Sequence, residues 1–252
     1  MTAVEVHGIG FWSLGFADAA AFAAGRPDEA VTAPSPTLGS KRHLRYTSDV
    51  TKMAIAACEQ SIAGSDLELT DLNVIFASSQ GEIQIAVELL DRIASGEGAS
   101  PARFMNSVHN TVCGHLSIAS KSHGAFSALA GSRQTVSGAL IEAFALLKTR
   151  DCESVVLVLG DESLPAPVDV ARYDSLAAAL FLRAGDGNGG SAEISAVVRD
   201  ESVRPFVAPP ELAENPCAPV LGVLAALAEN RAGLVRLDGE GDEGWCAELS
   251  FR

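Results

Sequence analysis

The chain has 252 residues, of which 48% are hydrophobic and 20% are charged. This composition can build a sizeable core in one large domain or two small ones, so it excludes intrinsic disorder and fibrous repeats. The net charge of −14 argues against a nucleic-acid or anionic membrane surface. No apolar run approaches the ~18 residues of a membrane helix, no signal peptide is visible, and the five cysteines show no CxxC spacing. We therefore expect a cytoplasmic protein with reduced thiols.

The predicted elements alternate between strands and helices. In the first half we expect a short strand at 4–7 that turns tightly at 8–10, a small helix at about 17–24 and a proline-containing loop at 27–40. A helix N-capped by Asp49 and extending to Ile62 follows, then a buried strand at 74–77, a helix at 83–93, a buried helix at 108–120 and a short strand at 126–130.

The second half continues the alternation. It begins with a helix at 135–149 and a strand at 154–160 that is apolar enough to be covered on both faces. Two strands, at 175–183 and 193–199, are expected to form a hairpin through the glycine-rich segment 185–190, which has no phosphate-loop signature. An irregular segment at 205–219, a helix at 220–229 and strands at 234–237 and 246–251 complete the chain. The pattern is typical of an α/β layered domain.

Four segments, in this order, resemble the first half of a β-ketoacyl synthase, the thiolase-fold condensing enzyme of fatty-acid and polyketide synthesis. Residues 6–15 are similar to the family's first strand and glycine turn, and VHNTVCGHLSI at 108–118 matches its V-N-x-x-A-G-H-L-S/T-I helix. Residues 142–162 fit a helix, an acidic turn and a strand ending in G-G-x-E, and residues 175–198 resemble the family's next hairpin.

The resemblance covers about residues 1–200. It implies a layered thiolase-like fold, with a mixed β-sheet flanked by helices, truncated to roughly one half of a condensing enzyme. We expect a single domain over 1–252, in which 201–252 is a shortened C-terminal extension. That extension could replace part of the missing half or simply close the sheet.

The resemblance also locates the family's nucleophilic cysteine, which lies at the N-terminus of the helix that begins near Thr135. Counting forward from Asn110 puts Arg133 at this position, whereas counting backward from Glu162 puts Gln134 there. Neither guanidinium nor carboxamide can attack a thioester. The chain's five histidines all precede the point where the family's catalytic half would begin. We therefore expect no catalytic residue, no metal and no cofactor.

Synthase-like subunits without the cysteine are known as chain-length factors, and short ones resemble those of bacterial aryl-polyene gene clusters. This resemblance implies a heterodimer with a full-length β-ketoacyl synthase, in which the present chain stabilises the synthase and bounds its acyl tunnel. Because an apolar sheet face would be left uncovered, we expect a large interface of ~2,000 Å² or more. The acidic net charge predicts that the acyl carrier protein, itself acidic, docks on the synthase and reaches this chain only indirectly.

The binding residues implied by the resemblance lie mainly on the helix at 108–120. Val108, Thr111, Val112 and His115 are expected to limit the growing chain by steric bulk, and Gln134 either polarises a bound carbonyl or caps its helix. For Val108, ordinary core packing is the alternative.

Two other functions remain open. Cys113, close to His109 and His115, could serve a stand-alone thioesterase or decarboxylase, although a buried cysteine in the place of a small residue is the preferred interpretation. The chain could also be a homodimeric acyl-binding module with no synthase partner.

Overall fold

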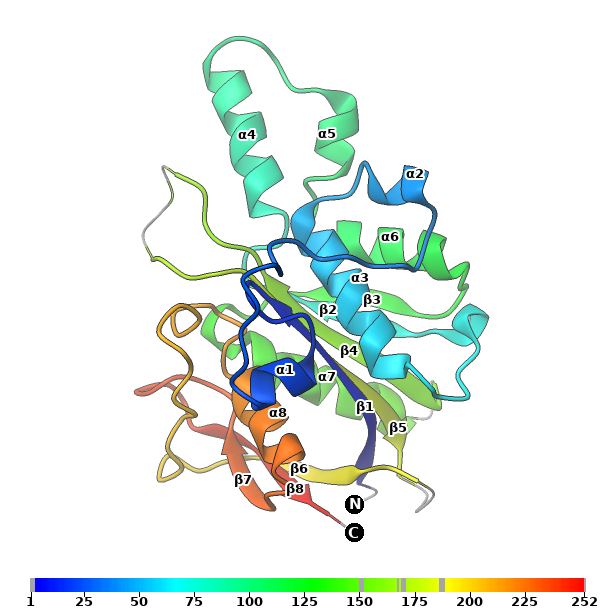
Figure 1. Ribbon diagram of the computed structural model, residues 1–252, viewed down its shortest axis with the longest axis vertical. Helices are drawn as coiled ribbons and strands as arrows, with labels where there is room; N and C mark the ends of the chain where they lie inside the picture. The colour runs from blue at the N-terminus through cyan, green and yellow to red at the C-terminus, as the bar shows by residue number, and fades with distance from the viewer. Residues whose placement is uncertain (1–2, 150–151, 167, 169–170, 186–188, 252) are drawn as a thin grey trace.

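A mixed eight-stranded β-sheet forms the centre of the structure, with helices on both faces (Figure 1). The computed structural model describes residues 3–149, 152–166, 168, 171–185 and 189–251. The strand order is β3-β2-β4-β5-β1-β6-β8-β7. Strand β2 is parallel to β3 and β4, and the other pairs are antiparallel. The predicted mixed α/β sheet is confirmed.

The strands are β1 (Val4–Ser13), β2 (Val74–Ala77), β3 (Phe126–Leu129), β4 (Ser154–Asp161), β5 (Leu176–Ala184), β6 (Ala192–Arg199), β7 (Gly233–Arg236) and β8 (Trp245–Ser250). The α-helices are α1 (Ala19–Ala23), α2 (Lys41–Leu44), α3 (Asp49–Ile62), α4 (Ile83–Ala94), α5 (Pro101–Met105), α6 (Thr111–Ser120), α7 (Thr135–Thr149) and α8 (Val220–Ala228). Two 3₁₀ turns, η1 (Leu69–Asp71) and η2 (Ser132–Gln134), complete the described elements.

Strand β1 corrects the expected glycine turn near the N-terminus. It continues through Gly8 and Gly10 as one strand of 10 residues, with a β-bulge between Val6 and Gly8. A Cβ at Gly8 would lie 1.9 Å from the carbonyl oxygen of Ser61, and one at Gly10 would lie 1.9 Å from that of Ala57. Both glycines are therefore needed because α3 packs directly on the strand, and not because the chain turns.

The N-terminal ends of two helices also differ from expectation. The Ser48 hydroxyl, and not Asp49, caps α3 by accepting a hydrogen bond from the backbone N–H of Thr51 at 3.1 Å. Helix α6 begins at Thr111 and not at 108, and the short helices α2 and α5 were not predicted. Helices of four or five residues leave almost no periodic signal in a sequence.

The expected hairpin between the strands at 175–183 and 193–199 is wrong. Strand β1 lies between β5 and β6 and pairs antiparallel with both, so that Val4 is opposite Ala184 on one side and Ile194 on the other. The hairpin interpretation rested on the glycine-rich segment 185–190 that connects the two strands. Residues 186–188 of this segment lie outside the described residues. Local loop chemistry cannot reveal that a distant strand inserts between its flanking strands.

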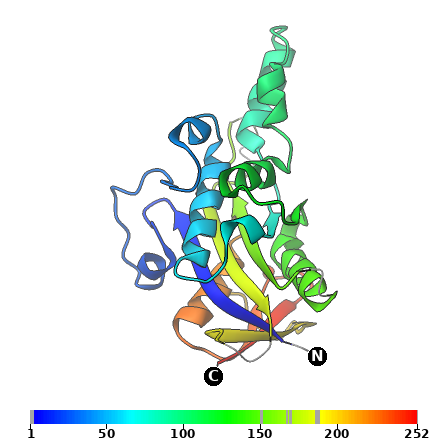
Figure 2. The same ribbon diagram turned by 90° about the vertical axis from the view of Figure 1, so that its right-hand side faces the viewer.

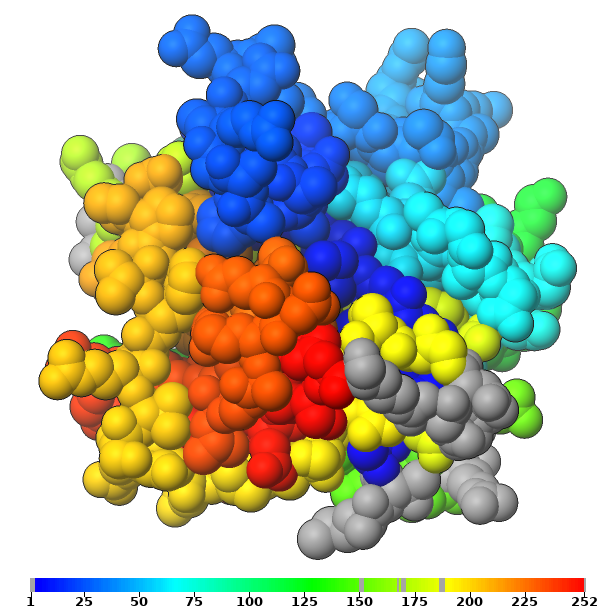
Figure 3. All heavy atoms as spheres, turned by 60° about the horizontal axis from the view of Figure 1, so that its bottom comes forward, coloured from blue at the N-terminus to red at the C-terminus, as the bar shows by residue number. Residues whose placement is uncertain are grey.

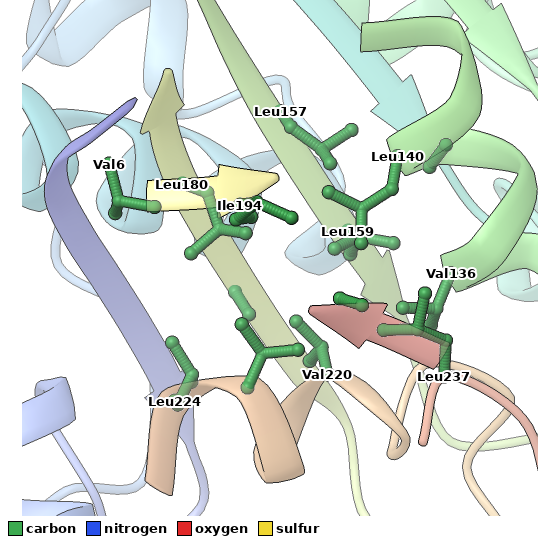
Figure 4. Packing of buried hydrophobic residues seen from close by; sticks show 14 of the residues in the cluster. Val6, Val136, Leu140, Leu157, Leu159, Leu180, Ile194, Val220, Leu224 and Leu237 are labelled. Atoms are coloured by element: carbon green, nitrogen blue, oxygen red, sulfur yellow. The ribbon is translucent and has the colours of Figure 1, made fainter. Parts of the chain in front are cut away.

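Two clusters of buried side chains lie on opposite faces of the sheet. Helices α3 and α6 pack on one face, where Phe76 and Phe181 are fully buried. Helices α7, α8 and α1 pack on the other face. Figure 4 shows Leu140 of α7 beside Leu157 and Leu159 of β4, with α8 closing the cluster.

The C-terminal extension takes part in both the sheet and its cover. Strands β8 and β7 lengthen the sheet beyond β6. Helix α8 buries Val220, Leu221 and Leu224 in the same cluster as α7. In the space-filling view of Figure 3, α8 (orange) lies directly against the N-terminal segment (blue). The extension therefore covers much of the apolar sheet face that a truncated fold was expected to expose.

Helices α4 and α5 form an arm that projects from the body (Figures 1 and 2). Large apolar side chains on this arm are exposed to solvent, including Leu90 and Ile93 on α4 and Phe104 and Met105 on α5. Across the described part of the chain, no helix combines the length and the hydropathy needed to cross a membrane.

Candidate functional site

The turn before α7 forms the first part of the candidate site, because the sequence resemblance places the family's nucleophile there. Ser132 has a φ of 51°, which places its backbone in the left-handed region. The Thr135 hydroxyl then fixes the turn by donating to the Ser132 carbonyl at 2.8 Å and accepting from the Gly131 N–H at 3.2 Å. The turn thus delivers residues 132–134 to the N-terminus of α7.

Arg133 and Gln134, the two residues that could replace the cysteine, have different surroundings. The exposed Arg133 guanidinium lies 3.3 Å from the carboxylate of Asp242, in the C-terminal loop between β7 and β8. Gln134 is half-buried, and its backbone N–H donates to the Gly131 carbonyl at 2.8 Å. Both residues lie at the helix N-terminus, and which of them replaces the cysteine stays a prediction.

Ser132 is the one residue of this turn with a hydroxyl that could act as a nucleophile, and a serine needs an adjacent base. The histidines with described contacts are engaged elsewhere. His7 lies 3.2 Å from Glu5, His109 lies 2.9 Å from the carbonyl of Ser78, and His43 lies against His115. None of these three histidine contacts involves the turn before α7.

Helix α6 and the residues before it do not place the predicted binding residues on one surface. Val108 is 40% exposed and so does not pack in the core. Val112 is fully buried in the cluster beneath α3, and Thr111 is also buried. His115 is half-buried and faces α2. The tunnel role of these residues stays a prediction, and Val108 is the residue among them most accessible to a partner.

Cys113 lies apart from the two histidines that flank it in sequence. Its thiol donates to the carbonyl of Ser127 at 3.2 Å, whereas His109 and His115 bind other groups. Burial raises the pKa of Cys113 to about 11, so the thiolate is scarce at neutral pH. Within the described ranges, no group of three or more histidine, cysteine or acidic side chains is arranged to hold a metal ion.

A histidine pair joins α2 to α6. The Nε2 atom of His43 lies 3.2 Å from Nδ1 of His115, whose Nε2 lies 3.3 Å from the Asn106 side-chain oxygen. If His115 donates to Asn106, its Nδ1 accepts from His43, so both bonds form with neutral rings. Burial and the neighbouring His43 lower the pKa of His115, which favours this neutral arrangement.

A buried carboxylate network at the ends of β2 and β4 was not predicted. The Asp161 carboxylate accepts hydrogen bonds from the Ser78 hydroxyl at 2.6 Å, from two backbone N–H groups of the following loop at 2.8 and 2.9 Å, and from the Cys217 thiol at 3.2 Å. Asn215 donates to the Asp161 carbonyl at 3.1 Å. The network ties the C-terminal extension to the sheet, and burial raises the pKa of Asp161.

Two further acids, Glu82 and Glu162, lie beside the N-termini of α3 and α4. Glu82 accepts from the hydroxyls of Ser48 and Thr51 at 2.8 and 2.9 Å, and burial raises its pKa to about 6. Glu162 accepts from the backbone N–H of Gln84 at 3.1 Å, and burial raises its pKa to about 7. Helix dipoles stabilise negative charge at these positions. The sequence signal for Glu162 was its place directly after a buried strand, whereas Glu82 follows β2 only after a loop.

The β3 edge of the sheet is open among the described strands. Strand β3 pairs only with β2, and its four residues are half-buried. The helices on either side carry exposed isoleucines, Ile118 on α6 and Ile141 on α7. Both helices also contain a glycine, Gly114 and Gly138, whose added Cβ would meet nothing within 4 Å. The chain's own packing therefore does not require glycine at these two positions. A missing side chain on an exposed helix allows the backbone of another chain to approach closely.

Comparison with solved structures confirms the fold. A ketosynthase (ApeO) in complex with its chain length factor (ApeC) from Xenorhabdus doucetiae is similar over 99% of both chains, with 18% identity and a TM-score of 0.74. The ishigamide ketosynthase/chain length factor is similar over 76% of this chain and 65% of that chain, with 16% identity and a TM-score of 0.62. The AntDE:AntF complex, an acyl-carrier protein with its ketosynthase, is similar over 100% and 99%, with 13% identity and a TM-score of 0.76. The chain therefore has the thiolase-like ketosynthase fold.

A search of curated proteins found no match. The sequence model of the β-ketoacyl synthase N-terminal domain matches residues 30–245. This range includes α2 to α8, the turn before α7 and the carboxylate network. The chain therefore belongs to the β-ketoacyl synthase N-terminal domain family.

Proposed function

We propose that the chain is a non-catalytic, chain-length-factor-like subunit that pairs with a full-length β-ketoacyl synthase in fatty-acid or polyketide synthesis, in the aryl-polyene branch and in the cytoplasm. The synthase carries out the decarboxylative condensation on carrier-bound acyl chains. The present chain completes the interface, supports the partner's active site and bounds its tunnel.

The observation that carries this proposal is the chemistry at the start of α7. A condensing enzyme needs a thiolate there, where the helix dipole and backbone N–H groups favour it. This chain has Arg133 and half-buried Gln134 there instead, and neither side chain can attack a thioester. Two buried cysteines elsewhere do not compensate, because burial raises the pKa of Cys58 to about 12 and that of Cys217 well above its usual value.

The open β3 edge supports a partner of related fold. A second sheet can pair with this edge, and helices from the same partner can approach Gly114 and Gly138 closely. Solved structures of similar fold include ketosynthases in complex with chain length factors, which supports this choice of partner. Val108, exposed just before α6, is the residue we assign to the end of the partner's tunnel.

The alternative of a stand-alone enzyme finds less support. A stand-alone thioesterase or decarboxylase that uses Cys113 would need a thiolate at a site where burial raises the thiol pKa to about 11. A homodimeric acyl-binding module would use the same open edge, and this alternative differs only in the identity of the second chain.

Co-expression with a synthase encoded nearby tests the proposal. We expect the two chains to co-purify as a heterodimer that condenses malonyl- and acyl-thioesters, and we expect the present chain alone to be inactive. Replacing the synthase's cysteine should abolish activity in the heterodimer. Turnover by the lone chain would contradict the proposal, as would a stable homodimer that does not exchange with the synthase.

A further inference from the structure

The arm formed by α4 and α5 is attached to the body at a base that contains two buried acidic side chains (Figures 1 and 2). Glu82, the N-cap residue of α4, is 1% exposed, and Glu162, which follows β4 directly, is 3% exposed. Because burial of an unpaired charge is costly, buried acids are normally paired, fully hydrogen-bonded or protonated. The contacts of these two side chains therefore determine how firmly the arm is held.

Both acids connect the first turn of α4 to the first turn of α3. The Glu82 side chain does not cap its own helix, and its Oε1 atom accepts from the hydroxyls of Ser48 and Thr51 at the start of α3, at 2.8 and 2.9 Å. Glu162 accepts from the backbone N–H of Gln84 in α4 at 3.1 Å and from that of Val50 in α3. The pair thus bridges the N-termini of the two helices, one of which belongs to the arm.

The surroundings of this pair favour its protonated form. Burial raises the pKa of Glu162 from 4.5 to about 7, and the charges of Glu82 and Asp49 raise it further. Burial also raises the pKa of Glu82, from 4.5 to about 6. Two nearby cations already have carboxylate partners, since Lys52 lies 2.9 Å from Asp49 and Arg103 lies 2.9 Å from Glu88. The other titratable or charged side chains around the base are Arg45, Asp91, His109, Asp161 and Tyr173.

The second oxygen of Glu82 shows what ionisation would cost. Its Oε2 atom is buried and has no hydrogen-bond partner among the residues that the structure describes. A neutral carboxyl group can carry its proton there, whereas a carboxylate would leave a charged oxygen without a donor. Hydration of that oxygen requires the start of α4 to move away from α3. A hollow lined by Asp49, Gln84 and Glu162 lies beside this point and gives water a route to the pair.

We propose that Glu82 and Glu162 form a proton-controlled hinge at the base of the arm. When both carboxyl groups are protonated, the start of α4 is held against α3, and their ionisation releases it. Opening hydrates the two acids and returns their pKa towards 4.5, so the open arm binds fewer protons than the closed arm. Opening therefore becomes more favourable as the pH rises from about 6 to about 8.

Hydrogen exchange of the full chain, followed by mass spectrometry between about pH 6 and about pH 8, tests the hinge. Exchange rates at the start of α4, corrected for the intrinsic pH dependence of exchange, give the opening equilibrium there. The test variant combines Glu82→Gln with Glu162→Gln, because glutamine keeps the shape of the side chain but cannot ionise. The matched control combines Asp91→Asn with Glu97→Gln, which removes two charges from exposed positions on the same arm.

We expect opening at the start of α4 to increase about tenfold over this pH range in the original chain and in the control, and to change less than about twofold in the test variant. An equal increase in the test variant would overturn the proposal, because another group would then control the opening.

The original chain alone provides a second test, which does not depend on whether the variants fold. The absence of any increase with pH would exclude the hinge. Exchange of α4 at the same rate as buried β4 would also exclude it, because the arm would then open only when the whole chain unfolds. None of these measurements involves the synthase, so their failure would leave the proposed function unaffected.

Discussion

Replacing Gly114 or Gly138 with alanine should stabilise the isolated chain and weaken its pairing with the synthase. Glycine within a helix costs about 0.5–1 kcal/mol relative to alanine. In both positions the added methyl group meets nothing within 4 Å, so the chain itself offers no compensating contact. Together the two substitutions should stabilise the chain by about 1–2 kcal/mol, and each 1 kcal/mol raises the Tm of a protein of this size by about 2–4 °C.

Urea unfolding of the isolated chain measures the first effect, and titration with the synthase measures the second. Gly222→Ala on α8 is the matched control, because its Cβ would lie 2.9 Å from that of Phe206 and should therefore destabilise the chain. Gly114→Leu should stop co-purification with the synthase while leaving the isolated chain folded, because its side chain blocks close approach.

Two results would refute this reasoning. If alanine at Gly114 or Gly138 lowers the stability of the isolated chain, these glycines serve its own packing. If Gly114→Leu pairs with the synthase as tightly as the original chain does, the interface lies elsewhere.

Three further predictions concern the buried groups. Burial raises the pKa of Glu162 from 4.5 to about 7, so the folded chain holds a proton that the unfolded chain releases, and stability should fall as the pH rises through this range. Glu162→Gln should flatten that fall in urea unfolding, and an unchanged fall would assign it to another group. Leu224→Ala should cost about 2–4 kcal/mol in the same assay because this side chain is 2% exposed, whereas a loss below about 1 kcal/mol would remove α8 from the core. Cys113→Ala should keep the condensing activity of the heterodimer within about twofold, and a loss of a hundredfold would make its thiol catalytic.

Strands and helices with a strong local signal were predicted closely from the sequence. The strand at 74–77 and the helix at 135–149 have the predicted bounds, because an apolar run between turn residues and a clear 3.6-residue stripe each identify one structure. The expected turn at Gly8 and Gly10 and the hairpin before Ala192 failed for a shared reason. In both places the local structure is determined by an element that is distant in the chain. Helix α3 packs against the two glycines in the first case, and β1 inserts between β5 and β6 in the second.

The candidate site could be predicted only where a motif marked it. The start of α7 follows from the segment that ends at Glu162, and the structure places Arg133 and Gln134 there. The buried network of Asp161 could not be predicted, because its partners are separated from it by 54 to 83 positions in the chain.

Intact-mass analysis of the heterodimer after incubation with an acyl-loaded carrier tests the central claim most directly. The account predicts that the acyl group appears on the synthase when the synthase has its cysteine. The mass of the present chain should not change, whether or not the synthase has that cysteine. An acyl adduct on this chain, whether at Ser132, at Cys113 or at another residue, would contradict it.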